Sequence, residues 1–288
     1  MDCELPTWFN RFLVENGIQK ESYCIAADLP RYIRLKDSMA LDEVTRDLGS
    51  YSLSRVHWLP DFYSIDHDSK IVNCGSFKRG LFYGIDVSSG VAVTALEITK
   101  DDQILDLCCA PGAKLCYMAD LLGNDGNGTI TGVDVSKNRL SIVRSQLKKC
   151  KFDRIRLFNA DGTKFRACPP KKIGCAMIPR ASSDLTDDPI DSSPFHASRL
   201  LRGEKCYFNS DYLYDKVIVD AECTHDGSIV HVKNCSWKGW SGLEERLTSK
   251  EKLCELEQLQ RGLISNGKTC IESHLFILTT SFQKDSQC

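Results

Sequence analysis

The chain has 288 residues, which is enough for one large α/β domain with a small appendage. Its hydrophobic content of 42% and charged content of 26% are those of an ordinary globular protein. The sequence contains no run of 18 apolar residues, so no membrane span is predicted. A net charge of −2 argues against broad, nonspecific binding to a nucleic-acid backbone, although it leaves room for a local basic face.

The cysteine content indicates a reducing compartment. Fifteen cysteines is a high and odd number, but no C-x-x-C pair occurs, and the first residues lack the basic-then-apolar order of a signal peptide. We therefore expect reduced thiols in an intracellular protein of the cytoplasm, nucleus or nucleolus. No metal site is predicted, because no cysteine or histidine spacing matches a zinc site.

The first 40 residues predict a short helix followed by a strand. Apolar side chains recur at helical spacing over residues 8–13, and residues 29–35 alternate between apolar and polar. Three basic side chains on or beside this strand are candidates for phosphate contacts, with a solvated face as the alternative: Arg31, Arg34 and Lys36. Further on, residues 81–83 predict a strand, and Ser88 or Ser89 is expected to cap the next helix.

Residues 104–122 predict a strand, a turn and a helix. Ile104, Leu105 and Asp106 form an apolar run that ends in an acid, residues 108–112 are small, and residues 115–122 resume helical spacing. Such a turn lets a nucleotide-like ligand lie close to backbone N–H groups at a helix N-terminus. The G-x-G-x-x-G pattern of dinucleotide-binding proteins is absent here.

Two further strands are each followed by an acid. The strand predicted at 127–135 ends with Asp134, which lies roughly 20 residues past the glycine turn, where an acid can accept hydrogen bonds from ribose hydroxyls. The alternative for Asp134 is an ordinary helix-cap acid. Asp161 follows a third strand at 154–159, and an Asx turn is its alternative role.

Residues 164–213 are polar and rich in Pro, Ser and Asp, which predicts a mobile surface insertion. A fourth buried strand at 217–219 follows, with Asp220 at its end and Cys223 on the turn beyond it. A buried structural thiol is the alternative role for Cys223. Residues 247–264 predict a helix.

Two sequence motifs, each following a predicted strand, resemble motifs of one enzyme family. Cys-Ala-Pro-Gly-x-Lys at 109–114, directly after a strand, resembles motif I of the RsmB/NOP family of S-adenosylmethionine-dependent RNA cytosine-C5 methyltransferases. Residues 220–223 resemble its Asp-Ala-Pro-Cys motif, with Glu222 where proline is expected. The resemblance implies a Rossmann-like class I methyltransferase sheet in an α/β fold, within a domain at 76–288. It also implies a small N-terminal α+β, RNA-recognition-like subdomain at 1–75.

The resemblance also implies ligands and roles. It implies S-adenosylmethionine as cofactor and tRNA or rRNA as partner, without a membrane or metal. Cys223 and Asp220 take the catalytic positions, with Cys223 as the cysteine that assists product release. The implied cofactor-binding residues are Cys108, Cys109, Ala110, Pro111, Gly112, Ala113, Lys114, Asp134, Arg139, Asp161 and Asp220.

The C-terminus departs from the family. Thr279, Thr280 and Ser281 lie where Thr-Cys-Ser is expected, so Thr280 replaces the cysteine that attacks the base. The chain also ends before the last two strands of the family's sheet, which predicts a partner protein over the open edge. We therefore expect an RNA methyltransferase with impaired activity. The alternatives are a truncated, noncatalytic RNA- or cofactor-binding form that regulates a full-length relative and, more remotely, a Rossmann oxidoreductase.

Overall fold

The computed structural model describes residues 5–24, 29–170, 193–203 and 213–271. Two compact units are present: a smaller one from Met1–Leu29 and Glu222–Arg261, and a larger one from Pro30–Ala221 and Gly262–Thr280. Thr280 and most of the predicted insertion at 164–213 lie outside the described residues. The boundary predicted between residues 75 and 76 stays a prediction.

The smaller unit is helical. Its elements are α1 (Thr7–Glu15), α2 (Glu21–Cys24), α8 (Ile229–Lys238), α9 (Ser241–Thr248) and the first part of α10 (Lys250–Thr269). The predicted amphipathic helix is confirmed as α1, whose Phe9 and Leu13 are buried against Val232 of α8 and Leu243 of α9. The helix predicted at 247–264 is confirmed as α10 from residue 250 onward; residues 247–248 belong to α9, because the chain is extended at Ser249.

A four-stranded antiparallel sheet forms the first part of the larger unit. Its strands occur in the order β2 (Leu53–Arg55), β3 (Phe62–Ile65), β1 (Arg31–Leu35) and β4 (Phe82–Gly84). Two short helices accompany it, α3 (Leu41–Leu48) and α4 (Gly75–Lys78). Strand alternation sends Ile33 and Leu35 into a core with Val44 and Leu48 of α3, and leaves Arg34 on the opposite face.

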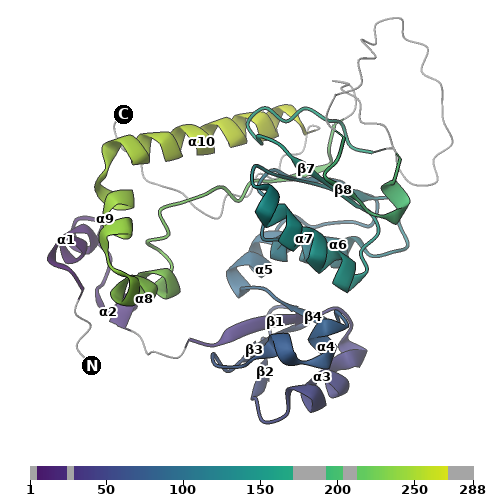
Figure 1. Cartoon of the computed structure of the whole chain (residues 1–288), viewed down its shortest axis with the longest axis horizontal. Coiled ribbons are helices and arrows are strands. Elements are labelled where there is room, and N and C mark those ends of the chain that lie inside the picture. The colour runs from purple at the N-terminus through teal and green to yellow at the C-terminus, as the bar shows by residue number, and fades with distance from the viewer. Residues whose placement is uncertain (1–4, 25–28, 171–192, 204–212, 272–288) are drawn as a thin grey trace, which may run out of the picture. The chain divides into compact units, whose positions relative to one another are not determined.

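A second, mostly parallel sheet forms the rest of the larger unit (Figure 1). Its strands occur in the order β8 (His196–Ala197), β7 (Ile155–Asn159), β6 (Thr129–Asp134), β5 (Gln103–Asp106) and β9 (Lys216–Ile218). Only β8 is antiparallel among these described strands. The predicted strands are confirmed, whereas β8, inside the predicted insertion, was missed because two residues carry no periodicity.

Helices cover one face of this sheet: α5 (Val87–Thr94), α6 (Ala113–Leu122) and α7 (Lys137–Cys150). Ile104, Ile130 and Ile218 pack on that helical face. Their neighbours Leu105 and Val217 pack on the other face, because successive strand residues point to opposite sides.

The C-terminal end of α10 packs against that second face. A Cβ on Gly162 would lie 2.7 Å from a methyl carbon of Leu263 and 2.8 Å from the backbone carbonyl oxygen of Leu107, and the backbone contact requires glycine here. Within the described residues the sheet ends at β9, where Tyr214 forms a single bridge to Ile271. None of the helices in these described ranges is long and apolar enough to cross a membrane.

Candidate cofactor site

Four acids lie along the carboxyl edge of the parallel strands. Asp106 ends β5, Asp134 ends β6, Asp161 follows β7 and Asp220 follows β9. Because β5, β6, β7 and β9 are parallel, their carboxyl ends share one edge of the sheet. The strand order reverses between β5 and β9, which is where doubly wound sheets bind their ligands.

The turn after β5 is held against β6. The Cys109 N–H donates to the Val133 carbonyl (2.9 Å) and the Ala110 N–H to Asp134 Oδ2 (3.2 Å). Both side chains are buried in the core, so any contact from Cys109 or Ala110 to a ligand comes from the backbone. Gly112 has φ of 105°, which favours glycine, and a Cβ there would lie 3.2 Å from Val143.

Helix α6 begins at this turn without a capping side chain. Gly112 occupies the N-cap position, so the first N–H groups of α6 have no side-chain acceptor. Lys114 of the first turn lies 2.5 Å from Asp220 Oδ2 and connects the two sides of the strand-order reversal. Half-buried Cys108 and Ala113 and exposed Pro111 complete the motif.

Asp134 is buried and anchored. Its Oδ1 accepts the Ser136 N–H at 2.9 Å, and its Oδ2 lies 3.4 Å from Arg139. Arg139 also donates to the Ala110 carbonyl, so it fastens α7 to the motif turn. Ser136 caps α7, and the cap of α5 is Asp86 rather than the predicted Ser88 or Ser89.

Asp161 is half exposed and forms a local turn. Its Oδ1 accepts hydrogen bonds from the Thr163 N–H (2.9 Å) and hydroxyl (2.7 Å), and these bonds lower its pKa. This is the Asx turn that the sequence predicts as the alternative role of Asp161. The turn leaves Oδ2 beside Lys164 at 3.8 Å. Asp161 therefore remains a candidate for an adenine amino group.

Asp106 lies at this site but was not among the site residues predicted from the sequence. The side chain is buried, accepts the Cys108 N–H at 3.1 Å and lies near Lys114, Asp134 and Asp220. Burial raises the pKa of Asp106 to about 7. Its position could have predicted this role, because Asp106 ends a buried strand as Asp134 does.

We expect Asp106→Asn to flatten the pH dependence of stability. The folded-state pKa of about 7 lies above the ordinary value of 3.8, so the folded chain binds a proton that the unfolded chain has lost. Wild-type unfolding free energy should therefore fall as pH rises from 4 to 7, by at most about 1.4 kcal/mol per pH unit from this group. Urea unfolding at several pH values measures the difference. Asp161→Asn is the control, because a lowered pKa acts only below about pH 4.

Cys223 lies in the smaller unit and has a histidine beside it. Its Sγ is 3.5 Å from Nδ1 of His225, and the His225 ring stacks on that of His231 with centroids 4.6 Å apart. Burial, with His231 and Arg246 nearby, lowers the pKa of His225, so its ring is neutral at pH 7 and can accept a proton. Glu222 lies 3.9 Å from Arg246. Asp220 belongs to the larger unit, and pairing it with Cys223 stays a prediction.

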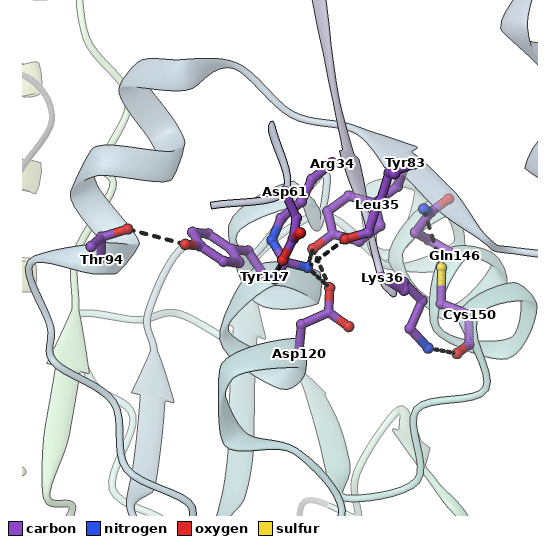
Figure 2. Close-up of polar contacts among 10 residues, drawn as sticks. All are labelled: Arg34, Leu35, Lys36, Asp61, Tyr83, Thr94, Tyr117, Asp120, Gln146 and Cys150. Carbon is purple, nitrogen blue, oxygen red and sulfur yellow. Dashed lines mark hydrogen bonds and ion pairs between the residues drawn. The ribbon is translucent and has the colours of Figure 1, made fainter. Parts of the chain in front are cut away.

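Two of the basic residues considered for phosphate contact are engaged inside the larger unit (Figure 2). Arg34 is 6% exposed and pairs with Asp120 of α6, and Lys36 donates to the Cys150 carbonyl at 2.5 Å. The phosphate hypothesis for Arg34 is therefore wrong. Alternation along β1 placed it on the face toward α6, where an acid meets it.

Comparisons with known proteins agree with this geometry. The family described as 16S rRNA methyltransferase RsmB/F matches residues 93–178. Ribosomal RNA small subunit methyltransferase F of Vibrio cholerae is 29% identical over 133 residues, which cover 44% of this chain and 28% of that protein. The tRNA (cytosine(72)-C(5))-methyltransferase of Pyrococcus horikoshii is 36% identical over 89 residues, 31% of this chain and 22% of the relative. These matches thus span less than a third of each curated relative.

Solved structures share the fold over most of the chain. The crystal structure of PH0851 superposes with a TM-score of 0.67 at 19% identity, covering 96% of this chain and 53% of that one. NSun6 from Pyrococcus horikoshii with SFG superposes with a TM-score of 0.66 at 15% identity, covering 96% and 84%. The sheet order and these neighbours define a Rossmann-like methyltransferase fold. Over residues 93–178 the chain is similar to the RsmB/F family of methyltransferases.

The carboxyl edge fits the cofactor of that family, S-adenosylmethionine. The cofactor carries a sulfonium, an ammonium, ribose hydroxyls and an adenine amino group, all of which favour carboxylate acceptors. Asp106, Asp134, Asp161 and Asp220 supply such acceptors from four adjacent strands. The uncapped start of α6 adds donors for a carboxylate.

Proposed function

We propose that this chain transfers a methyl group from S-adenosylmethionine to C5 of a cytosine in RNA. The observation that carries the proposal is the row of four acids beside the Cys-Ala-Pro-Gly-x-Lys turn. Support for the substrate class comes from the two relatives, one named for rRNA and one for tRNA cytosine C5. Because they are matched over less than a third of their length, tRNA and rRNA both remain in the proposal.

The reaction needs a thiolate, because cytosine C5 is a poor nucleophile. Addition of a thiolate at C6 makes C5 nucleophilic; after C5 attacks the methyl group, loss of the C5 proton expels the thiolate again. When bound, the cofactor supplies an electrophilic methyl group. The resemblance gives Cys223 the role of the cysteine that assists product release; because Thr280 stands where the attacking cysteine is expected, we propose that Cys223 takes the attacking role in this chain. Neutral His225, whose Nδ1 lies 3.5 Å from Cys223 Sγ, can accept the thiol proton. In the proposal, Asp220 lies beside the base and the methyl donor.

Incubation of the purified chain with tritiated S-adenosylmethionine and unmodified tRNA and rRNA transcripts tests the proposal. We expect tritium in 5-methylcytosine, and a loss of at least about 1000-fold in Cys223→Ala, since no other group replaces a catalytic thiol. Cys254→Ala is the matched control, because Cys254 is a half-buried thiol of α10 in the same unit. Activity retained by Cys223→Ala would contradict the role of this thiol.

The sequence also favours a second candidate, a noncatalytic form that binds RNA and the cofactor. Thr280 replaces the attacking cysteine of the family and lies outside the described residues. This candidate predicts cofactor binding and RNA binding without methyl transfer. The same incubation, with binding measured in parallel, separates the two.

For partners and location, we propose RNA as the main partner and an intracellular setting, in the cytoplasm or nucleus, where such RNA occurs. A partner protein over the edge of the sheet beyond β9 is part of the proposal. Its support is the short pairing there, a single bridge between Tyr214 and Ile271. Co-purification of the tagged chain tests that partner.

A further inference from the structure

A basic pocket of about 330 Å³ lies in the larger unit at the amino end of β7. The end of α7 supplies Lys148, with Lys151 just beyond it, and the segment through β8 supplies His196, Arg199 and Arg202. The antiparallel pairing of β8 with β7 brings these two segments together, because Leu157 is opposite His196 and Arg156 opposite Ala197. The pocket is therefore built from residues about 50 positions apart.

The charges of the pocket do not cancel. Asp153 is the carboxylate that lines it, and it already pairs with Arg199 at 3.4 Å. Lys148, Lys151 and Arg202 are exposed, and no carboxylate in the described parts of the chain forms an ion pair with them. Burial, together with the charges of Lys148, Arg144 and Arg202, lowers the pKa of His196. Four Lys or Arg side chains and one carboxylate thus line the pocket.

The basic character extends along α7. Residues 137–152 contain six Lys or Arg residues and no Asp or Glu, although the whole chain has 37 basic and 39 acidic residues. Arg144 lies one turn before Lys148 on α7, next to the pocket, and its guanidinium lies 5.1 Å from the ring centre of Phe195. From Arg144 to Cys150, the last residue of α7, the helix rises about 9 Å at about 1.5 Å per residue, and Lys151 follows directly.

This pocket is separate from the cofactor edge. It lies before β7, whereas Asp161 lies after it, and five residues of strand at about 3.3 Å each separate the two ends. A phosphate group bound in this pocket would therefore lie away from the cofactor and from the target base. The pocket therefore has a binding role rather than a chemical one.

We propose that this pocket and the adjoining face of α7 bind backbone phosphates of the RNA substrate, at a distance from the target nucleotide. The inference rests on the proposed function and adds a specific RNA contact to it. RNA fits better than a single free anion because the cations extend for about 10 Å, and a nucleic-acid duplex carries about one negative charge per 1.7 Å of axis. The local positive face also reconciles RNA binding with the net charge of −2.

Charge reversal in the pocket tests the proposal. Lys148→Glu with Arg202→Glu should weaken binding of a fluorescent tRNA transcript by about tenfold or more near 0.1 M salt. It should also lower the slope of log Kd against log salt by about 1.5, since two phosphate contacts are lost. The matched control is Lys70→Glu with Lys100→Glu, two exposed lysines of the same unit outside the pocket. Fluorescence anisotropy at several salt concentrations gives both quantities, and thermal melting checks the fold.

Two outcomes would overturn the proposal. One is that the pocket variant and the control weaken RNA binding equally, which would mean that only the net charge of the chain affects RNA affinity. The other is displacement of the RNA by millimolar inorganic phosphate, which would assign the pocket to a free anion.

The measurement is made without S-adenosylmethionine, so it separates the pocket from the proposed function. RNA binding that depends on Lys148 and Arg202, without any methyl transfer, would overturn the function and keep the pocket. Methyl transfer by the wild-type chain, together with unchanged RNA binding in the pocket variant, would support the function and overturn the pocket proposal.

Discussion

Asp134→Ala should raise the dissociation constant for S-adenosylmethionine by about 100-fold or more. Asp134 is the one acid of the edge that is buried and held by two backbone N–H groups, those of Ala110 and Ser136. Its oxygens keep lone pairs for two ribose hydroxyls, and each hydrogen bond to a charged acceptor contributes about 1.5–3 kcal/mol. Calorimetric titration of the purified chain measures the effect.

The controls separate lost contacts from lost folding. Asp66→Ala removes an acid directly after β3 of the antiparallel sheet; this acid also accepts a backbone N–H, from Ser52 at 2.9 Å, and the variant should bind the cofactor as wild type does. Asp161→Ala removes one half-exposed acceptor and should cost about tenfold. A folded Asp134→Ala chain with unchanged affinity would contradict the assignment of this edge to the cofactor.

Asp120→Ala should lower the free energy of unfolding by about 3 kcal/mol, because it leaves the buried, charged Arg34 with only the longer ion pair to Asp61, at 3.8 Å. The side chains of Arg34 and Asp120 are 7% and 6% exposed. Figure 2 shows both pointing toward Tyr83, whose hydroxyl donates to Asp120 Oδ2 at 2.6 Å. The Arg34 guanidinium also lies 4.5 Å from the ring centre of Tyr117. Urea unfolding measures the loss.

An exposed ion pair is the matched comparison. Arg79 and Glu43 are 55% and 49% exposed, so Glu43→Ala should change the unfolding free energy by less than about 1 kcal/mol. The double variant Arg34→Met, Asp120→Leu should recover most of the lost stability, because an apolar pair removes both buried charges. Equal effects of Asp120→Ala and Glu43→Ala would contradict the importance of the buried pair.

The sequence by itself determined the repeating strands and helices, the acids at the strand ends and the resemblance to a methyltransferase family. These follow from local signals: a buried run such as 104–106 predicts a strand, and an acid at its end needs no distant partner to be recognised. The motif turn at 108–114 was predicted for the same reason, since small residues and a glycine with positive φ define it locally.

The tertiary structure alone decided which charges are buried and which remain available. Arg34 meets Asp120 across 86 residues of sequence, and Tyr23 donates to the Asp226 carbonyl across 203, so no local pattern reveals either contact. The raised pKa of Asp106 likewise comes from burial beside acids of other strands. The basic pocket depends on β8, a two-residue strand that only its pairing with β7 defines. Burial and charge neighbourhood are properties of the folded chain, because residues distant in sequence create them.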